Sequence, residues 1–112
     1  MNNLEDIIQA ESYQWFHNNY PEMRGLLFAV PNGGKRDPIT MNKMKSTGLY
    51  PGIPDLIFML NGKGYGFECK VPGGKLTGEQ PKVHATWDKF GNPIYMFYSL
   101  EEFKLIMLNI IT

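Results

Sequence analysis

The middle of the chain contains two short apolar runs that have the length and composition of β-strands. They span residues 55–60 and 65–71 and are separated by a turn sequence. That sequence contains Asn61-Gly62, and Asn-Gly between apolar runs is a strong signal for a two-residue hairpin turn. We therefore predict an antiparallel β-hairpin, with its turn at either Asn61-Gly62 or Gly62-Lys63.

Apolar periodicity and turn residues divide the rest of the chain into helices and strands. Helices are expected at residues 4–19, at about 40–46, at about 78–90 and after a Ser99 cap, and strands at 26–30 and 94–98. Thr77 and Gln80 have the spacing of a capping box, which places the start of the third helix. That helix can cross over between the strands at 65–71 and 94–98. The predicted fold class is therefore α/β, a small mixed sheet flanked by helices, in one domain spanning residues 1–112.

The first helix has a carboxylate among its apolar positions. Its periodic positions are Leu4, Ile7, Ile8, Glu11, Trp15 and Phe16. Glu11 lies three residues after Ile8 and four before Trp15, which places it on the stripe predicted to face the core. An ionised carboxylate on such a stripe is costly unless it is paired or coordinated. Glu11 therefore either lies at the edge of the stripe and reaches water, or it belongs to a charged site.

The predicted hairpin brings three charged residues to one face. Side chains alternate across a strand, so Glu68 and Lys70 share one face and Cys69 occupies the other. Both possible turns put Asp55 on the face of Glu68 and Lys70, because the two registers differ by an even number of residues. Opposed residues have Cβ atoms roughly 4.5–5.5 Å apart. These charged side chains should therefore converge.

Such a cluster has two interpretations. Two carboxylates that close repel each other unless a cation lies between them. Hard oxygen ligands favour Mg²⁺ or Mn²⁺ over zinc, and Lys70 could then hold or deprotonate a water molecule beside the metal. The alternative is a surface hairpin with an ordinary ion pair between Lys70 and one of the carboxylates.

Composition predicts a folded protein without disulfides, a membrane span or a secretory signal. With 43% hydrophobic and 13% aromatic residues, the chain is expected to fold. Its one cysteine, Cys69, excludes an internal disulfide and is expected to be a buried thiol, which fits a reducing cytoplasm. No apolar run approaches about 18 residues, so no membrane span is expected. The first residues lack the pattern of a secretory signal, and a cytoplasmic protein is expected.

The charges cancel overall but are unevenly distributed. With eleven acidic and eleven basic residues, net charge gives no support for nucleic-acid binding. Residues 1–24 are mostly acidic, whereas residues 31–54 are mostly basic. The loop at 31–38 places glycine N–H groups beside two cations, so it is either a phosphate-binding loop or a plain turn. A second Gly-rich basic loop follows the hairpin at 72–76.

The motif Pro54-Asp55 followed by Glu68-Cys69-Lys70 resembles that of the PD-(D/E)xK nuclease superfamily, whose restriction-endonuclease-like core has the order αβββαβ. Within that superfamily the chain resembles the VRR-NUC domains, specifically the compact stand-alone type found in phages and bacteria. Further matching segments, between Glu11 and about Ser99, are Glu11, residues 31–36, residues 52–56, Gly74-Lys75-Leu76-Thr77 and Gln80. The chain lacks the Val-Arg-Arg triplet that gives the family its name, which leaves the substrate preference open.

The resemblance implies a metal-dependent DNA endonuclease with Mg²⁺ or Mn²⁺ as its cofactor. The metal ligands that it implies are Asp55, Glu68, Cys69 through its carbonyl, and Glu11 either directly or through water. Lys70 would orient or activate the attacking water. Gln80 would support Lys70 or the water shell of the metal.

The resemblance also implies the partners. They are branched duplex DNA, including four-way (Holliday) junctions, and a second copy of the chain, because two-fold symmetry suits paired cuts. The predicted DNA contacts are Asn32, Lys35, Arg36, Lys43, Lys45, Lys75 and Lys82. Two alternatives stay open: a flap-type or sequence-specific nuclease with the same site, and a catalytically idle DNA-binding module.

Overall fold

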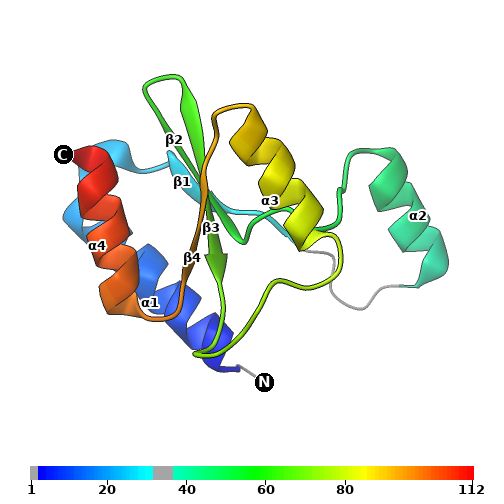
Figure 1. The fold of residues 1–112 in the computed structure, drawn as a ribbon, viewed down its shortest axis with the longest axis horizontal. Coiled ribbons are helices and arrows are strands. Elements are labelled where there is room, and N and C mark those ends of the chain that lie inside the picture. Colours follow the sequence, from blue (N-terminus) through cyan, green and yellow to red (C-terminus); the bar gives the residue numbers. More distant parts are fainter. Residues whose placement is uncertain (1–2, 32–36) are drawn as a thin grey trace.

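A four-stranded mixed sheet runs through the middle of the molecule, with helices on both of its faces (Figure 1). The computed structural model describes residues 3–31 and 37–112. In chain order the described elements are α1 (Leu4–Asn19), the 3₁₀ helix η1 (Pro21–Met23), β1 (Leu27–Ala29), α2 (Pro38–Ser46), β2 (Leu56–Leu60), β3 (Lys63–Cys69), α3 (Gln80–Lys89), β4 (Ile94–Phe97) and α4 (Leu100–Ile111). The predicted α/β class and αβββαβ core order are confirmed, with α2 inserted between β1 and β2.

The sheet has the strand order β1-β2-β3-β4. Strands β1 and β3 are antiparallel to β2, and β4 is parallel to β3. Antiparallel neighbours need only a short turn, whereas parallel neighbours need a long crossover. Helix α3 provides that crossover between β3 and β4, as predicted. The strand ends differ from the predicted ones by one or two residues, because pairing partners rather than composition decide where each ladder stops.

The hairpin turn is Asn61-Gly62, one of the two predicted alternatives. Leu60 pairs with Lys63 at the last rung of the ladder. Both turn residues have positive φ angles, 51° for Asn61 and 78° for Gly62, as a type I′ turn requires. Every pair in the ladder follows from this turn, so the turn sets the register of the whole hairpin.

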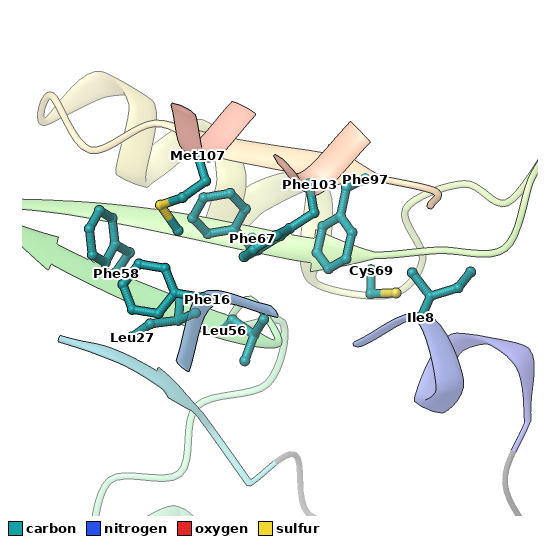
Figure 2. Packing of buried hydrophobic residues seen from close by; sticks show 10 residues of the cluster. All are labelled: Ile8, Phe16, Leu27, Leu56, Phe58, Phe67, Cys69, Phe97, Phe103 and Met107. Carbon is teal, nitrogen blue, oxygen red and sulfur yellow. The ribbon is translucent and has the colours of Figure 1, made fainter. Parts of the chain in front are cut away.

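The face of the sheet that packs against α1 and α4 forms the hydrophobic core (Figure 2). The buried core residues are Ile8, Phe16, Leu27, Leu56, Phe58, Phe67, Cys69, Phe97, Phe103 and Met107. The ring centroids of Phe67 and Phe103 are 4.9 Å apart, which places strand β3 directly against α4. Burying each such side chain contributes about 1.5–3 kcal/mol to folding. Because Phe67 and Cys69 face the core, Glu68 and Lys70 face the opposite side of the sheet.

The buried stripe of α1 differs from the predicted one. Ile8, Ser12 and Phe16 are buried, whereas Leu4 is 50% exposed and Glu11 is exposed. The interpretation that Glu11 lies on the core-facing stripe is therefore wrong, and its side chain reaches water. The buried position that follows Ile8 is Ser12, and a serine is invisible to an analysis of apolar periodicity.

Candidate metal-binding active site

Asp55 lies directly before β2 and, in the register of the hairpin, opposite Glu68. The Asp55 carbonyl accepts a hydrogen bond from Val30 on the β1 side, and the Lys70 N–H donates to Phe97 on the β4 side. The backbone groups of Asp55 and Glu68 therefore point away from each other. Opposed residues of this kind have the shortest side-chain separation in an antiparallel ladder.

The approach of Asp55 to β3 depends on a glycine. Pro54 is buried and lies against Gly66, the residue two before Glu68 on the same face. A Cβ atom at position 66 would lie 2.6 Å from Pro54 Cγ and 2.8 Å from Ile94 Cγ1. Only glycine leaves room for this contact, so the glycine and the proline together hold Asp55 beside the strand.

The backbone of Cys69 completes one side of the site. Its N–H donates to Asp55 Oδ2 at 2.8 Å. The N–H and C=O of one residue in an antiparallel strand point to the same side, so the Cys69 carbonyl faces the side on which Asp55 lies. Its thiol points the other way and donates to the Glu5 carbonyl, with Sγ to O at 3.4 Å. Burial raises the pKa of the Cys69 thiol to about 12, so it stays protonated at neutral pH.

Glu68 is a buried carboxyl group with a raised pKa. It is 1% exposed. Burial, followed by the hydrogen bond and negative charge of Asp55, raises the pKa of Glu68 to about 9, and the nearby charge of Lys70 opposes this rise. At neutral pH and without a cation, the Asp55–Glu68 pair therefore retains a proton.

Lys70 is also buried, 9% exposed, at the open end of the same face. Its positive charge lowers the pKa of Glu68. The pKa of His84 is also lowered, first by the burial of the ring and second by the charge of Lys70. The structure thus brings together Asp55, Glu68 and Lys70, two carboxyl groups and an ammonium within electrostatic reach of one another. The roles assigned to them from the sequence stay predictions.

Helix α3 covers this cluster with two polar side chains. Gln80 Nε2 donates to Glu68 Oε2 at 3.3 Å, and His84 Nε2 lies 3.4 Å from Glu68 Oε1. Gln80 is among the residues predicted from the sequence, whereas His84 is not. The available signal was its spacing: residues four apart share one helix face, so a residue at this position must face the same carboxylate.

The start of α3 differs from the predicted capping box. The helix begins at Gln80 rather than near residue 78, because Gly78 has a non-helical φ of 56°. The Gln80 side chain accepts from the Thr77 N–H at 2.8 Å, which is one of the two bonds of a capping box. Gly52 packs on this turn, since a Cβ there would lie 2.8 Å from the Glu79 carbonyl carbon. The loop before Pro54 therefore holds the residue that contacts Glu68.

Among the acidic residues of α1, Glu5 is the one whose charge affects the pKa values of both Glu68 and Cys69, while Asp6 affects that of Cys69. The negative charge of Glu5 raises both pKa values, whereas Glu11 lies exposed six residues further along the helix. Glu5 precedes Ile8 by three residues and so continues the buried stripe of α1 towards β3. Glu11 as a metal ligand stays a prediction that the geometry of this helix does not favour.

The predicted DNA contacts fall into two groups. Asn32, Lys35 and Arg36 lie outside the described residues. Lys43, Lys45, Lys75 and Lys82 are exposed. Lys82 is 3.8 Å from Glu79, whereas Lys45 lines a pocket of about 450 Å³ that Gln80 also lines. Of these four lysines, Lys45 therefore lies on a surface that is continuous with the candidate site.

The donor set suits a hard divalent cation. Within residues 3–31 and 37–112, no three side chains of His, Cys, Asp and Glu form a metal-binding group. The available ligands are instead the two carboxylates of Asp55 and Glu68 and the Cys69 carbonyl, all of them oxygens. Mg²⁺ is typically held by one or two carboxylates and keeps several waters, so this set fits Mg²⁺ or Mn²⁺ and does not fit zinc.

Mixed sheet, crossover helix and carboxylate-bearing hairpin define the class: an α/β domain that resembles the PD-(D/E)xK fold. The sequence matches no family model and no curated protein. The fold is similar to that of a solved structure named "VRR_NUC domain protein", with a TM-score of 0.76 and 18% sequence identity over 96% of this chain and 88% of that chain. The fold predicted from the sequence resemblance is thereby confirmed. In the described ranges, no helix has the length and hydrophobicity to cross a membrane.

Proposed function

We propose that this protein is a metal-dependent nuclease that hydrolyses phosphodiester bonds in DNA. The observation that carries the proposal is the pairing of the buried Glu68 with the partly buried Asp55 beside Lys70, with the pKa of Glu68 raised to about 9 by burial and by Asp55. A carboxyl pair that must either retain a proton or bind a cation is costly for a scaffold that does not use it. The fold shared with the VRR_NUC domain protein supports the same conclusion.

Asp55, Glu68 and the Cys69 carbonyl would hold the metal, Mg²⁺ or Mn²⁺. A metal bound there would polarise the phosphodiester and lower the pKa of a bound water. Lys70 holds the attacking water or accepts its proton. Gln80 donates a hydrogen bond to Glu68. Its role in this proposal is therefore to orient the metal ligand Glu68, and not to support Lys70.

The substrate that we propose is branched duplex DNA, including four-way junctions. The described residues of one chain carry one such hairpin site, whereas resolving a junction needs two cuts related by two-fold symmetry, and a homodimer would supply them. The exposed lysines near the site and the basic loop at 31–38 would contact phosphates. A cytoplasmic location is consistent with a protonated, buried Cys69.

A cleavage assay tests this function. Linear, flap and four-way-junction DNA, each labelled at one end, are incubated with the protein in Mg²⁺, Mn²⁺, Ca²⁺ or EDTA. We expect cleavage in Mg²⁺ or Mn²⁺, strongest on the junction, and none in EDTA or for Asp55→Asn. Preferred cutting of flaps or of one linear sequence would retain the nuclease and change its substrate. If no DNA is cut in either metal, the nuclease proposal is rejected and the alternative of a catalytically idle DNA-binding module is retained.

A further inference from the structure

His84 contacts the buried carboxyl group from a position that the proposed mechanism does not use. Its Nε2 atom is 3.4 Å from Glu68 Oε1, and its side chain is 13% exposed against 2% for Glu68. Gln80 contacts the other oxygen, Oε2, at 3.3 Å. Each oxygen of Glu68 therefore has its own partner on the same helix, one turn apart.

The two partners are held differently. Gln80 can present only its N–H₂ group to Glu68, because its Oε1 already accepts from the Thr77 N–H at 2.8 Å. The His84 contact joins Nε2 to Glu68 Oε1 at 3.4 Å, and which of the two atoms donates depends on the tautomer of the ring. When Glu68 is an ionised metal ligand it has no proton to give, so His84 Nε2 would be the donor.

We propose that His84 is a positioning residue: together with Gln80 it fixes the plane of the Glu68 carboxylate so that its free lone pairs face Asp55 and a divalent cation between them. This inference rests on the proposed function. The terminal χ3 torsion of glutamate has a broad distribution of angles. With the hydrogen bond from Gln80 alone, the carboxylate plane could therefore still rotate. Each carboxylate oxygen accepts more than one bond, so a bond from α3 leaves room for a metal.

A residue that only packs against Glu68 would behave differently from one that donates to it. Leucine fills a similar volume and donates nothing, whereas glutamine has an N–H₂ group at a similar reach. His84→Leu and His84→Gln therefore separate the two roles. His17→Gln is the matched control, because His17 is the other histidine of the chain and lies on α1, with its ring stacked on Tyr13.

The experiment measures Mn²⁺ affinity by isothermal titration calorimetry in the absence of DNA, with circular dichroism as a check of folding. We expect His84→Leu to weaken Mn²⁺ binding by about 10-fold or more, the usual effect of losing a hydrogen-bond partner of a metal ligand. His84→Gln should recover most of that loss, and His17→Gln should match the wild type. Cleavage of DNA at limiting Mn²⁺ should follow the same order and become nearly equal at saturating metal.

Equal Mn²⁺ affinity of the wild type and a folded His84→Leu would overturn the positioning role. If His84→Leu does not fold, His84→Asn replaces it, because its amide is too short to reach Glu68; equal binding by the Asn and Gln variants would then also overturn the role. A wild type that binds no Mn²⁺ would refute the proposed function itself. A wild type that binds Mn²⁺ while His84→Leu binds it equally would refute only the role of His84.

Discussion

Glu68 shows how the position of one residue determines its chemistry. The side chain lies on the face of β3 opposite to the core residues Phe67 and Cys69, where Gln80 and His84 of α3 contact its carboxyl group, which has little access to water. Asp55 lies opposite it and adds a second negative charge. Burial and Asp55 together raise the pKa of Glu68 to about 9, and a cation bound at the pair would reverse this shift.

The pH dependence of stability follows from this raised pKa. In the folded state Glu68 keeps its proton up to about pH 9, whereas in the unfolded state it ionises near pH 4.3. The folded state therefore binds more protons between these values, and stability is lost as pH rises through that window. In EDTA we expect Glu68→Gln to raise the melting temperature more at pH 8 than at pH 5, as measured by differential scanning fluorimetry. An equal increase at both pH values would contradict the pKa assignment.

Substitution of Lys70 tests the step that follows metal binding. A lysine side chain can act as a proton acceptor in enzymes, whereas arginine is not deprotonated in proteins. We expect Lys70→Ala to reduce the cleavage rate by about 100-fold or more, within the range of a lost general base. If Lys70 accepts the proton, the cleavage rate of Lys70→Arg should be reduced as much as that of Lys70→Ala. If Lys70 supplies only charge, Lys70→Arg should retain part of the wild-type rate. Single-turnover rates in saturating Mg²⁺ distinguish these outcomes, and near-normal turnover of Lys70→Ala would remove the residue from the mechanism.

Among the elements, the hairpin of β2 and β3 could be predicted almost completely from the sequence. Asn61-Gly62 limited the register to two possibilities, and both placed Asp55 on the face of Glu68 and Lys70. The hairpin could be predicted because turn chemistry and strand alternation are local properties of the chain. The fold class and the crossover by α3 were predictable for the same reason.

Helix faces could not be predicted as well, because they depend on contacts between distant segments. The buried stripe of α1 contains Ser12, which apolar periodicity does not detect, so the periodicity placed Glu11 on the buried face, whereas Glu11 is exposed and the charge of Glu5 raises the pKa of Glu68. His84 was missed for a similar reason. Its importance comes from meeting Glu68, 16 residues earlier in the chain, and neither residue shows that contact by itself.

The contact between Gly66 and Pro54 gives a prediction at the scale of the hairpin. In Gly66→Ala the new Cβ would lie 2.6 Å from Pro54 Cγ, which must displace the proline and Asp55 with it. We expect a loss of stability of about 1–3 kcal/mol, typical of overpacking, together with weaker metal binding. Urea denaturation and Mn²⁺ titration measure the two effects.

Gly64→Ala is the matched control on the same strand and the same face. Its Cβ would meet Asn92 Oδ1 at 3.5 Å and Met59 Sδ at 3.6 Å, which are ordinary contacts. This variant should bind Mn²⁺ like the wild type. A Gly66→Ala variant that behaves like Gly64→Ala would show that Pro54 tolerates displacement and that Asp55 is held by other contacts.

For the whole molecule, the proposed function raises the question of how a chain of zero net charge would bind DNA. Helices α1 and α4 cover one face of the sheet, and the carboxylate site lies on the other, beside α3 (Figure 1). The basic residues near that second face come from α2 and from the loop between β3 and α3. Binding should therefore depend on a local basic surface rather than on net charge, and salt should weaken it strongly.

Replacing Lys35 and Arg36 together by alanine tests whether the basic loop predicted at residues 31–38 adds to the phosphate contacts. Each phosphate contact contributes roughly 0.9 to the slope of log affinity against log salt. The double variant should bind every DNA shape more weakly and flatten the slope by about two units, as measured by fluorescence anisotropy in Ca²⁺ with an Asp55→Asn background. Lys63→Ala with Lys104→Ala removes two charges elsewhere and should leave the slope unchanged. Equal slopes for both double variants would place the DNA on another surface.

The alternation of β3 means that selection for folding and selection for the proposed chemistry would act on interleaved residues of one strand. Phe67 and Cys69 face the core, while Gly66, Glu68 and Lys70 face the site. A lineage could therefore lose its chemistry by changing only the second set and persist as a stable binding protein. It could also exchange core residues while its reaction stays the same. In the first case substitutions would accumulate at positions 66, 68 and 70, and in the second at positions 67 and 69.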